Sequence, residues 1–212
     1  MNPAVVAGAA GAGFLLGLFF ERWVAVLLAD GKPHRPVLLA GVNAALFALA
    51  ASAAGSGARS LSGMLLFGLL LVASVTDLRQ RIIPNPVVLA GLVAALTVEA
   101  LARPIAPVQS LLGAVVAGGF LWILEAASGG GVGRGDVKLA AVMGLVLGPG
   151  PAVVALLLAF ALGATGSALL LAVRRVGMLA RIPFGPFLMA GGVVAFLAGA
   201  PLIHWYLAII RA

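Results

Sequence analysis

Two acidic residues, Asp77 and Asp136, each stand beside a hydrophobic run long enough to enter a lipid bilayer. Asp77 lies in the stretch SVTDLRQRIIPN and Asp136 in the stretch GGGVGRGDVKLAAVMG. An ionisable side chain at a membrane segment is energetically costly, which makes it a candidate functional residue. Two carboxylic acids that share a proton supply an acid and a base together, so this pair of residue types indicates acid–base chemistry.

Peptide hydrolysis is one reaction that such a pair can perform. The ionised acid takes a proton from water, while the protonated acid polarises the carbonyl group and then protonates the leaving amine. Gly133 and Gly135 suit such a site, because glycine lets a loop bend sharply and lets a substrate backbone come close. Asp136 alone is equally typical of a helix N-cap, and Asp77 alone is typical of an interfacial residue that pairs with a nearby arginine. The prediction of a site therefore depends on both acids lying at one depth.

The composition predicts an integral membrane protein. Of its 212 residues, 63% are hydrophobic and only 9% are charged, whereas soluble domains average about 25% charged residues. We therefore expect an all-α, polytopic membrane helix bundle in which residues 1–212 form a single domain. The net charge of +7 comes from basic residues between apolar segments, which favours membrane topology over nucleic-acid binding. Without cysteine, and with only two histidines far apart in the sequence, no metal or organic cofactor is expected.

Eight apolar segments are separated by glycine, proline or charged residues, and the sixth is unusually short. They cover roughly residues 4–29, 37–54, 60–77, 86–102, 109–127, 137–147, 152–173 and 184–210. A helix over 137–147 would be ~16 Å long, against a hydrocarbon core of about 30 Å. Its inner end must therefore be shielded by protein or line a wet cavity. The alternative is one kinked helix that continues through 148–151.

The basic residues predict the orientation of the bundle, because positive charge is retained on the cytoplasmic side. Alternate loops hold Lys32, Arg35, Arg79, Arg81, Arg134, Lys138, Arg174, Arg175 and Arg181. The other side holds only Arg59, Arg103 and Arg211. We therefore predict that the first set faces the cytoplasm and that both termini lie outside. Asp77 ends the third segment and Asp136 begins the sixth, so this topology places both acids at the cytoplasmic face.

Three motifs resemble those of the type IV prepilin peptidases, which are GxGD membrane aspartyl proteases. Residues 77–85 (DLRQRIIPN) look like the first-aspartate motif of that family, residues 133–139 (GRGDVKL) like the second, and residues 182–187 (IPFGPF) like the start of its last helix. The resemblance covers the chain from about residue 60 to its end. It implies catalytic roles for Asp77 and Asp136, and cleavage of prepilin or pseudopilin leaders at the cytoplasmic face of the cell membrane.

The same resemblance implies the partners and limits the activity. The substrate would be a prepilin or pseudopilin helix lying in the bilayer, and no oligomeric state is implied. Long bacterial members carry a cysteine-containing cytoplasmic insertion after the first helix and also methylate the new N-terminus. Here residues 30–36 form a short loop without cysteine, which predicts a peptidase-only form. Lys138 follows the second motif closely, and it is expected either to bind lipid phosphate or to shape the electrostatics of the site.

Two other classes of protein share parts of this pattern. A presenilin-type intramembrane protease would use the same GxGD chemistry, but its first aspartate usually follows a tyrosine, whereas Thr76 precedes Asp77 here. An ion- or proton-coupled transporter could use the two aspartates for its cargo. Transporters commonly contain internal repeats, and none is evident in this chain. A transporter would also leave the Pro-Asn motif and the Pro-Phe-Gly-Pro motif without an explanation.

Overall fold

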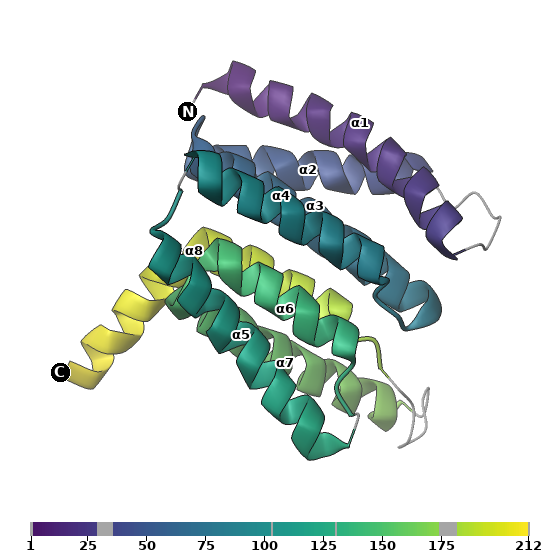
Figure 1. Ribbon diagram of the computed structural model, residues 1–212, viewed down its shortest axis with the longest axis vertical. Coiled ribbons are helices and arrows are strands. Elements are labelled where there is room, and N and C mark those ends of the chain that lie inside the picture. Colours follow the sequence, from purple (N-terminus) through teal and green to yellow (C-terminus); the bar gives the residue numbers. More distant parts are fainter. Residues whose placement is uncertain (1, 29–35, 103, 130, 174–181, 212) are drawn as a thin grey trace.

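The described part of the chain is a bundle of eight α-helices without β-strands (Figure 1). This computed structural model describes residues 2–28, 36–102, 104–129, 131–173 and 182–211. The helices are α1 (Pro3–Leu28), α2 (Pro36–Ala54), α3 (Ala58–Gln80), α4 (Asn85–Ala102), α5 (Pro107–Ser128), α6 (Arg134–Leu147), α7 (Pro149–Ala172) and α8 (Gly185–Arg211). Each helix coincides with one predicted apolar segment, and the expected all-α class is confirmed.

Seven of the eight helices are long and apolar enough to cross a membrane. The exception is α6, whose 14 residues give a length of ~21 Å, well short of a hydrocarbon core of about 30 Å. Its end is set by Gly148, which has a φ of 76° that only glycine adopts easily, and α7 begins at Pro149. The prediction of a short sixth helix is therefore confirmed, and the alternative of one kinked helix through 148–151 is wrong. The protein is an integral membrane protein.

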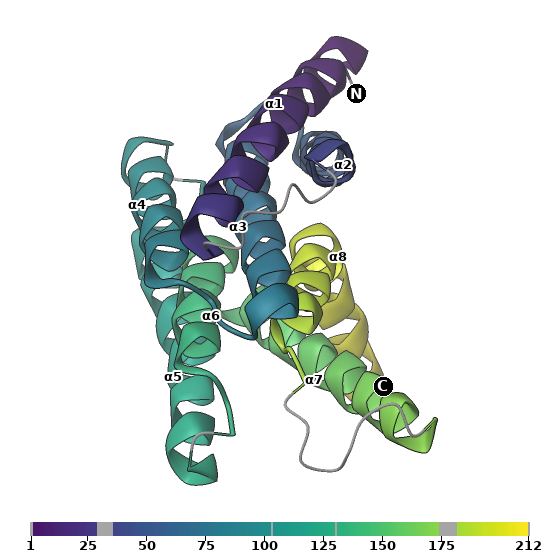
Figure 2. The ribbon, with the colours of Figure 1, turned by 90° about the vertical axis from the view of Figure 1, so that its right-hand side faces the viewer.

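Helix α3, which carries Asp77, is the most deeply buried element of the bundle. In its most apolar stretch 72% of the residues are buried, whereas the corresponding share in the other six long helices is 17–28%. It contacts α1, α2, α4, α6 and α8, and Figure 2 shows it between α4 and α8. The outer helices expose apolar side chains instead, as expected for surfaces that lipid covers.

Helix α6, which carries Asp136, lies against α5 through glycine residues. A Cβ atom on Gly113 of α5 would overlap the carbonyl oxygen of Gly144 in α6, and a Cβ on Gly144 would overlap the carbonyl oxygen of Gly113. Small residues let two helix backbones approach this closely in a membrane, where van der Waals contact stabilises helix pairs. The short helix is therefore held along its length by its longer neighbour.

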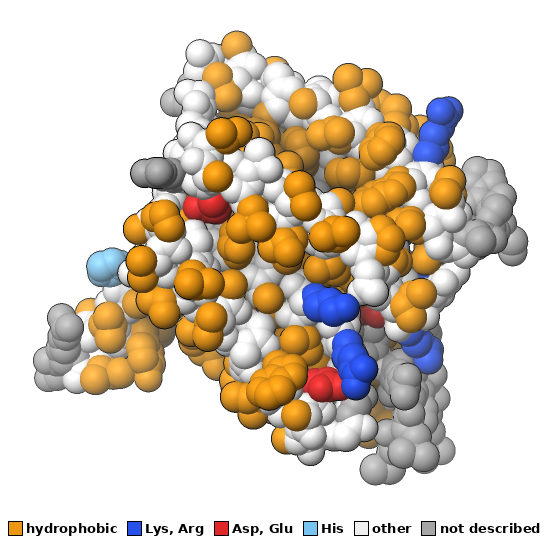
Figure 3. All heavy atoms as spheres, in the orientation of Figure 1, with side chains coloured by type: hydrophobic (Ala, Val, Ile, Leu, Met, Phe, Trp, Pro, Cys, Tyr) orange, Lys and Arg blue, Asp and Glu red, His pale blue; other side chains and the backbone are white. Residues whose placement is uncertain are grey.

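Charged side chains gather at the end of the bundle where α3 and α5 finish and α4 and α6 begin. The view in Figure 3 shows Lys and Arg side chains near this end and a largely apolar surface between the two ends. The described basic residues placed here by their helices include Arg79, Arg81, Arg134 and Lys138, whereas Arg59 lies at the opposite end. The predicted topology residues Lys32, Arg35, Arg103, Arg174, Arg175 and Arg181 lie outside the described residues.

Candidate active site

Asp77 lies in the last turn of α3 and is only 5% exposed. The helix ends at Arg81, which has a left-handed conformation and donates its backbone N–H to the carbonyl oxygen of Asp77 at 2.7 Å. The Asp77 side chain is held by α8. Its Oδ2 accepts the backbone N–H of Gly185 at 2.7 Å, and the N–H of Phe184 is a second backbone donor. The buried carboxylate therefore has dedicated hydrogen-bond donors, as a buried charge requires.

Asp136 lies in the first turn of α6 and is 8% exposed. It does not occupy the N-cap position, because Gly133 is the N-cap residue and accepts the N–H of Val137 through its carbonyl oxygen. The Asp136 carboxylate reaches back to the N–H of Gly133 instead, as the third helical residue does in a capping box. Its Oδ1 is buried without a hydrogen-bond partner among the described residues. Asp136 therefore has fewer hydrogen-bond donors than Asp77 among the described residues.

The structure brings the two acids together at the junction of α3, α6 and α8, which all contact one another. Burial, and after it the negative charge of Asp77, raise the pKa of Asp136, because both disfavour its ionised form. One ionised and one protonated carboxyl group is the state that this arrangement favours.

The loop that holds Asp136 lies against the loop that follows Asp77. A Cβ atom on Gly135 would come within 2.8 Å of the Cβ of Ile83, so a side chain at position 135 would push the two loops apart. Gly133 is similarly close, since its Cβ would meet Oδ2 of Asp136 at 2.7 Å. Both predicted glycines are therefore explained by close approach in the folded protein, at the two positions that flank Arg134.

Lys138 has a protein partner in this arrangement. Its Nζ donates to Oδ1 of Asn85, the first residue of α4, at 2.8 Å. This hydrogen bond joins the second motif to Asn85, the last residue of the first motif. The sequence analysis assigned no role to Asn85. Of the two expectations for Lys138, a role in shaping the site agrees better with this contact than binding to lipid phosphate does.

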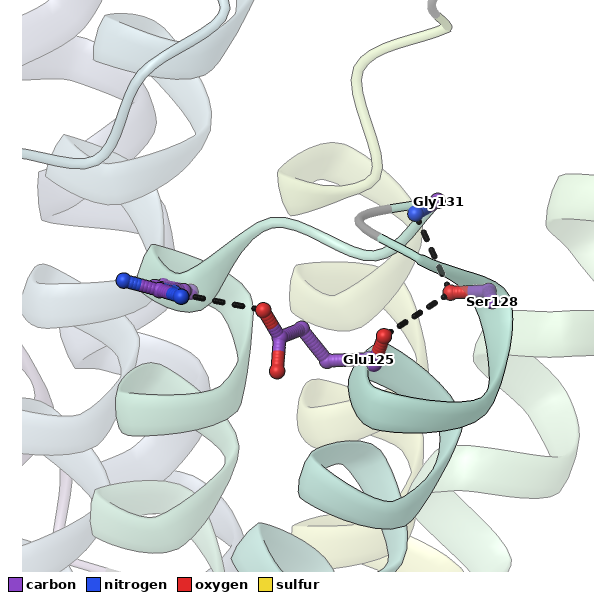
Figure 4. Close-up of polar contacts among 4 residues, drawn as sticks. Glu125, Ser128 and Gly131 are labelled. Atoms are coloured by element: carbon purple, nitrogen blue, oxygen red, sulfur yellow. Dashed lines mark hydrogen bonds and ion pairs between the residues drawn. The ribbon is translucent and has the colours of Figure 1, made fainter.

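A third carboxylate at this end of the bundle belongs to a surface ion pair. Glu125 near the end of α5 lies 3.2 Å from Nε of Arg134, and the arginine side chain is 87% exposed. Figure 4 shows the Glu125 side chain extending from α5 toward the start of α6, with Ser128 between the backbone of Glu125 and Gly131. Such an exposed pair contributes little to stability. Glu125 is therefore a suitable control for substitutions of the two aspartates.

Two further interactions near Asp77 were not predicted. Arg79, which was assigned only a topological role, forms an ion pair with the buried Glu21 of α1 at 3.3 Å. Ser74, one turn before Asp77, donates to the carbonyl oxygen of Gly185 at 3.1 Å. The sequence feature that could have indicated Ser74 is its position three residues before Asp77, which places the two side chains on one face of the helix.

Within the described residues, no three His, Cys, Asp or Glu side chains gather in a way that could hold a metal ion.

Comparison with known proteins assigns residues 64–168 to the type IV leader peptidase family, a match that includes both aspartates. Three relatives are named prepilin leader peptidase/N-methyltransferase. The protein from Bacillus subtilis (strain 168) is 35% identical over 78% of this chain and 67% of its own length. The protein from Pseudomonas putida is 36% identical over 61% of this chain and 47% of its own length. The protein from Aeromonas hydrophila is 30% identical over 70% of this chain and 53% of its own length. The chain thus spans about half to two thirds of these relatives. No solved structure matches it significantly.

Fold and site together define an integral membrane helix bundle with two acidic side chains buried at one end. The family match includes both aspartate motifs and runs from α3 to α7. The chain belongs to the type IV leader peptidase family.

The contact between Lys138 and Asn85 predicts energetic coupling between α4 and α6. We expect Lys138→Ala and Asn85→Ala each to lower the free energy of unfolding by about 0.5–1.5 kcal/mol, the usual contribution of a hydrogen bond. The double variant should lose less than the sum, because either change alone already breaks the bond. Thermal unfolding of all four proteins in one detergent measures this cycle, and strictly additive losses would show that the contact carries no energy.

Proposed function

We propose that this protein is an intramembrane aspartyl endopeptidase that cleaves the leader peptide from type IV prepilins or pseudopilins. The observation that carries the proposal is that two buried carboxyl groups, Asp77 at the end of α3 and Asp136 at the start of α6, lie at one end of the bundle on helices that contact each other. Family membership and the names of the relatives support the substrate class. In this proposal Asp77 and Asp136 are the catalytic pair, and Gly133, Gly135 and Lys138 form the supporting loop.

The hydrogen bonds around the two acids suggest a division of roles. Asp77 accepts backbone N–H groups at the start of α8, where the helix dipole favours a negative charge. Asp136 is bonded by the N–H of Gly133 and has a buried oxygen without a partner, which favours its neutral form. We therefore assign the ionised role to Asp77 and the protonated role to Asp136.

The reaction then follows from these two states. Asp77 removes a proton from a water molecule as its oxygen attacks the scissile carbonyl carbon, while the proton of Asp136 moves onto the carbonyl oxygen. When the tetrahedral intermediate collapses, the C–N bond breaks and the amine takes the proton that Asp77 received from water. Because Asp136 has already given its proton to the carbonyl oxygen, the amine is protonated by Asp77 and not, as expected from the sequence, by the acid that began protonated. The hydroxyl proton returns to Asp136, so the enzyme recovers its starting state. No cofactor is required for this sequence of steps.

The position of the pair supports cleavage at the membrane surface rather than at its centre. Both acids lie at the end of the bundle that carries Arg79, Arg81, Arg134 and Lys138, and basic residues favour the cytoplasmic side. The shortness of α6 brings its far end to mid-depth, beside α5 and α7. We propose that the protein lies in the cytoplasmic membrane, and that the substrate helix lies in the surrounding lipid with its leader junction at the cytoplasmic face.

We expect the mature product to carry an unmodified N-terminus. The relatives are named for both peptidase and N-methyltransferase activity, but this chain contains no cysteine, the residue that marks the insertion of the long, methylating members. Incubation of purified protein with a prepilin and S-adenosylmethionine, followed by intact-mass measurement, tests this. A product heavier by one methyl group would contradict the peptidase-only assignment and would leave the peptidase assignment intact.

The proposal as a whole is tested against ion transport in one preparation. Purified protein is reconstituted in liposomes, and one portion receives a prepilin while the other is assayed for proton and sodium flux. We expect loss of the leader from the prepilin and no flux above that of protein-free liposomes. The contrary result is ion flux that requires Asp77 and Asp136, while the folded protein cleaves no prepilin. That result would reject the peptidase function in favour of a transporter.

A further inference from the structure

The backbone of Gly185 is held on both sides by residues of α3. Its N–H donates to Oδ2 of Asp77 at 2.7 Å, and its carbonyl oxygen accepts the hydroxyl of Ser74 at 3.1 Å. Both hydrogen bonds are buried. Ser74 and Asp77 are three residues apart, so they project from one face of α3. We call this arrangement, formed by Ser74, Asp77 and Gly185, the Gly185 clamp.

The N–H of Gly185 is available because of where α8 begins. The N–H of Leu188 bonds to the carbonyl oxygen of Phe184, so Phe184 is the cap residue and Gly185 is the first residue of the helix. The N–H groups of a first helical turn have no acceptor within their own helix. Asp77 supplies that acceptor from another helix, and a carboxylate at a helix N-terminus is electrostatically favoured. The orientation of the Asp77 side chain therefore depends on the position of the first turn of α8 against α3.

Gly185 lies in close contact with Asp77. A Cβ atom at position 185 would lie 3.0 Å from Oδ2 and 3.1 Å from Cβ of Asp77, so the Asp77 side chain would have to move by a few tenths of an ångström to admit it. The hydroxyl of Ser74 is a second contact between α3 and Gly185, on the carbonyl side of that residue.

Other contacts hold α8 on α3 without the clamp. The rings of Phe67 in α3 and Phe196 in α8 meet edge to face with centroids 5.2 Å apart. Phe196 also covers Gly63, where a Cβ atom would overlap its ring. Because these contacts lie far along both helices from Gly185, loss of the Ser74 hydroxyl leaves the two helices associated. Its effect is confined to the start of α8.

We propose that Ser74 is a positioning residue that orients Asp77 through the backbone of Gly185. Ser74 acts on the reaction indirectly, since it holds the first residue of α8 in the place where that residue fixes the Asp77 carboxylate. This inference rests on the proposed peptidase function for its catalytic consequence, but the physical linkage between Ser74 and the start of α8 is independent of that function.

Ser62 offers a matched control. It is a buried serine on the same helix, and its hydroxyl bonds to the carbonyl oxygen of Ala58 four residues earlier at 3.1 Å. Ser74 has one hydroxyl hydrogen, which is shared between two acceptors: the carbonyl oxygen of Leu70 at 2.7 Å, the equivalent helix-internal partner, and the carbonyl oxygen of Gly185 at 3.1 Å. Ser62→Ala therefore removes the helix-internal bond alone, and the difference between the two alanine variants isolates the contact with α8.

The first test is kinetic and uses full-length protein in detergent with a prepilin substrate. We expect Ser74→Ala to lower kcat about fivefold to tenfold with KM within about twofold of wild type, a change of the size that loss of one hydrogen bond produces. Ser74→Thr, which keeps the hydroxyl, should stay within about threefold of wild type. Ser62→Ala should match wild type. All rates are expressed per folded protein, quantified by size exclusion. A kcat of Ser74→Ala equal to that of Ser62→Ala would overturn the proposal.

The second test does not need catalysis. Hydrogen exchange at the start of α8, residues 184–188, is measured by mass spectrometry in wild type, Ser74→Ala and Ser62→Ala. We expect faster exchange in Ser74→Ala alone, because the first turn of α8 is then less firmly held. If Ser74→Ala exchanges at the wild-type rate in this segment, the proposed role of Ser74 in the Gly185 clamp is wrong, even if the enzyme is active. Failure of wild type to cleave any prepilin, with faster exchange in Ser74→Ala, would instead reject the proposed function and keep the clamp.

Discussion

Asp77→Asn and Asp136→Asn should each reduce prepilin cleavage by at least about a thousandfold, which is within the range that a positioned acid or base contributes. Asparagine is nearly the same size as aspartate, but it can neither accept a proton from water nor donate one to a carbonyl oxygen. Asp77→Asn keeps a side-chain oxygen that can accept the N–H of Gly185. We therefore expect loss of chemistry without loss of the fold.

Thermal unfolding separates these two effects. Each substitution replaces a buried carboxyl group with a neutral amide of nearly the same size, so the melting temperature should stay close to that of wild type. Glu125→Gln is the matched control, because it neutralises a carboxylate at the same end of the bundle that belongs only to an exposed ion pair. It should retain nearly full activity. Substantial cleavage by either asparagine variant would rule out the catalytic pair.

Gly113→Ala should destabilise the protein, whereas Gly119→Ala should not, although both glycines lie in α5. A Cβ at position 113 would overlap the carbonyl oxygen of Gly144 and lie 2.8 Å from the Cα of Gly148. Because these neighbours are backbone atoms, α6 must move, and overpacking of this kind costs about 1–3 kcal/mol. A Cβ at position 119 would have no atom within 4 Å, so Gly119→Ala gains only helix propensity, up to about 1 kcal/mol.

The two glycine variants also connect stability with the site. Displacement of α6 moves Asp136 relative to Asp77, so Gly113→Ala should lose cleavage beyond what its folded fraction explains. Melting temperatures and cleavage rates of both variants in one detergent give the comparison. Equal melting temperatures for the two would mean that the close contact of α5 with α6 does not hold the short helix in place.

The helices could be predicted from the sequence because a bilayer imposes a simple rule on apolar segments. The short sixth helix was predictable for the same reason, since Gly148 and Pro149 interrupt its apolar run. Its start was placed too late, at Val137 rather than at Arg134. The polar residues of the first turn interrupt the apolar run, yet a helix N-terminus accommodates Asp136 readily.

The charged members of the site and its two glycines were predictable from the sequence, but Ser74 was not. Asp77 and Asp136 stand out because charge is rare in an apolar chain, whereas Ser74 resembles any other small residue within an apolar helix. Its meaning depends on Gly185, which is 111 residues away in the sequence. The sequence left two roles open for Lys138 for the same reason, because Asn85, its partner, is 53 residues away. Contacts of this kind follow from the tertiary arrangement and from no local pattern.

The most direct test of the account is to map the site of cleavage. Purified wild-type protein and Asp136→Asn are incubated in detergent with several prepilins, and the products are identified by mass spectrometry. The account predicts one cut, at the boundary between the leader and the hydrophobic helix, made by wild type and absent from Asp136→Asn. Cuts elsewhere, cuts that persist in the variant, or no cut by folded wild-type protein would contradict the assignment of a leader peptidase that uses Asp77 and Asp136.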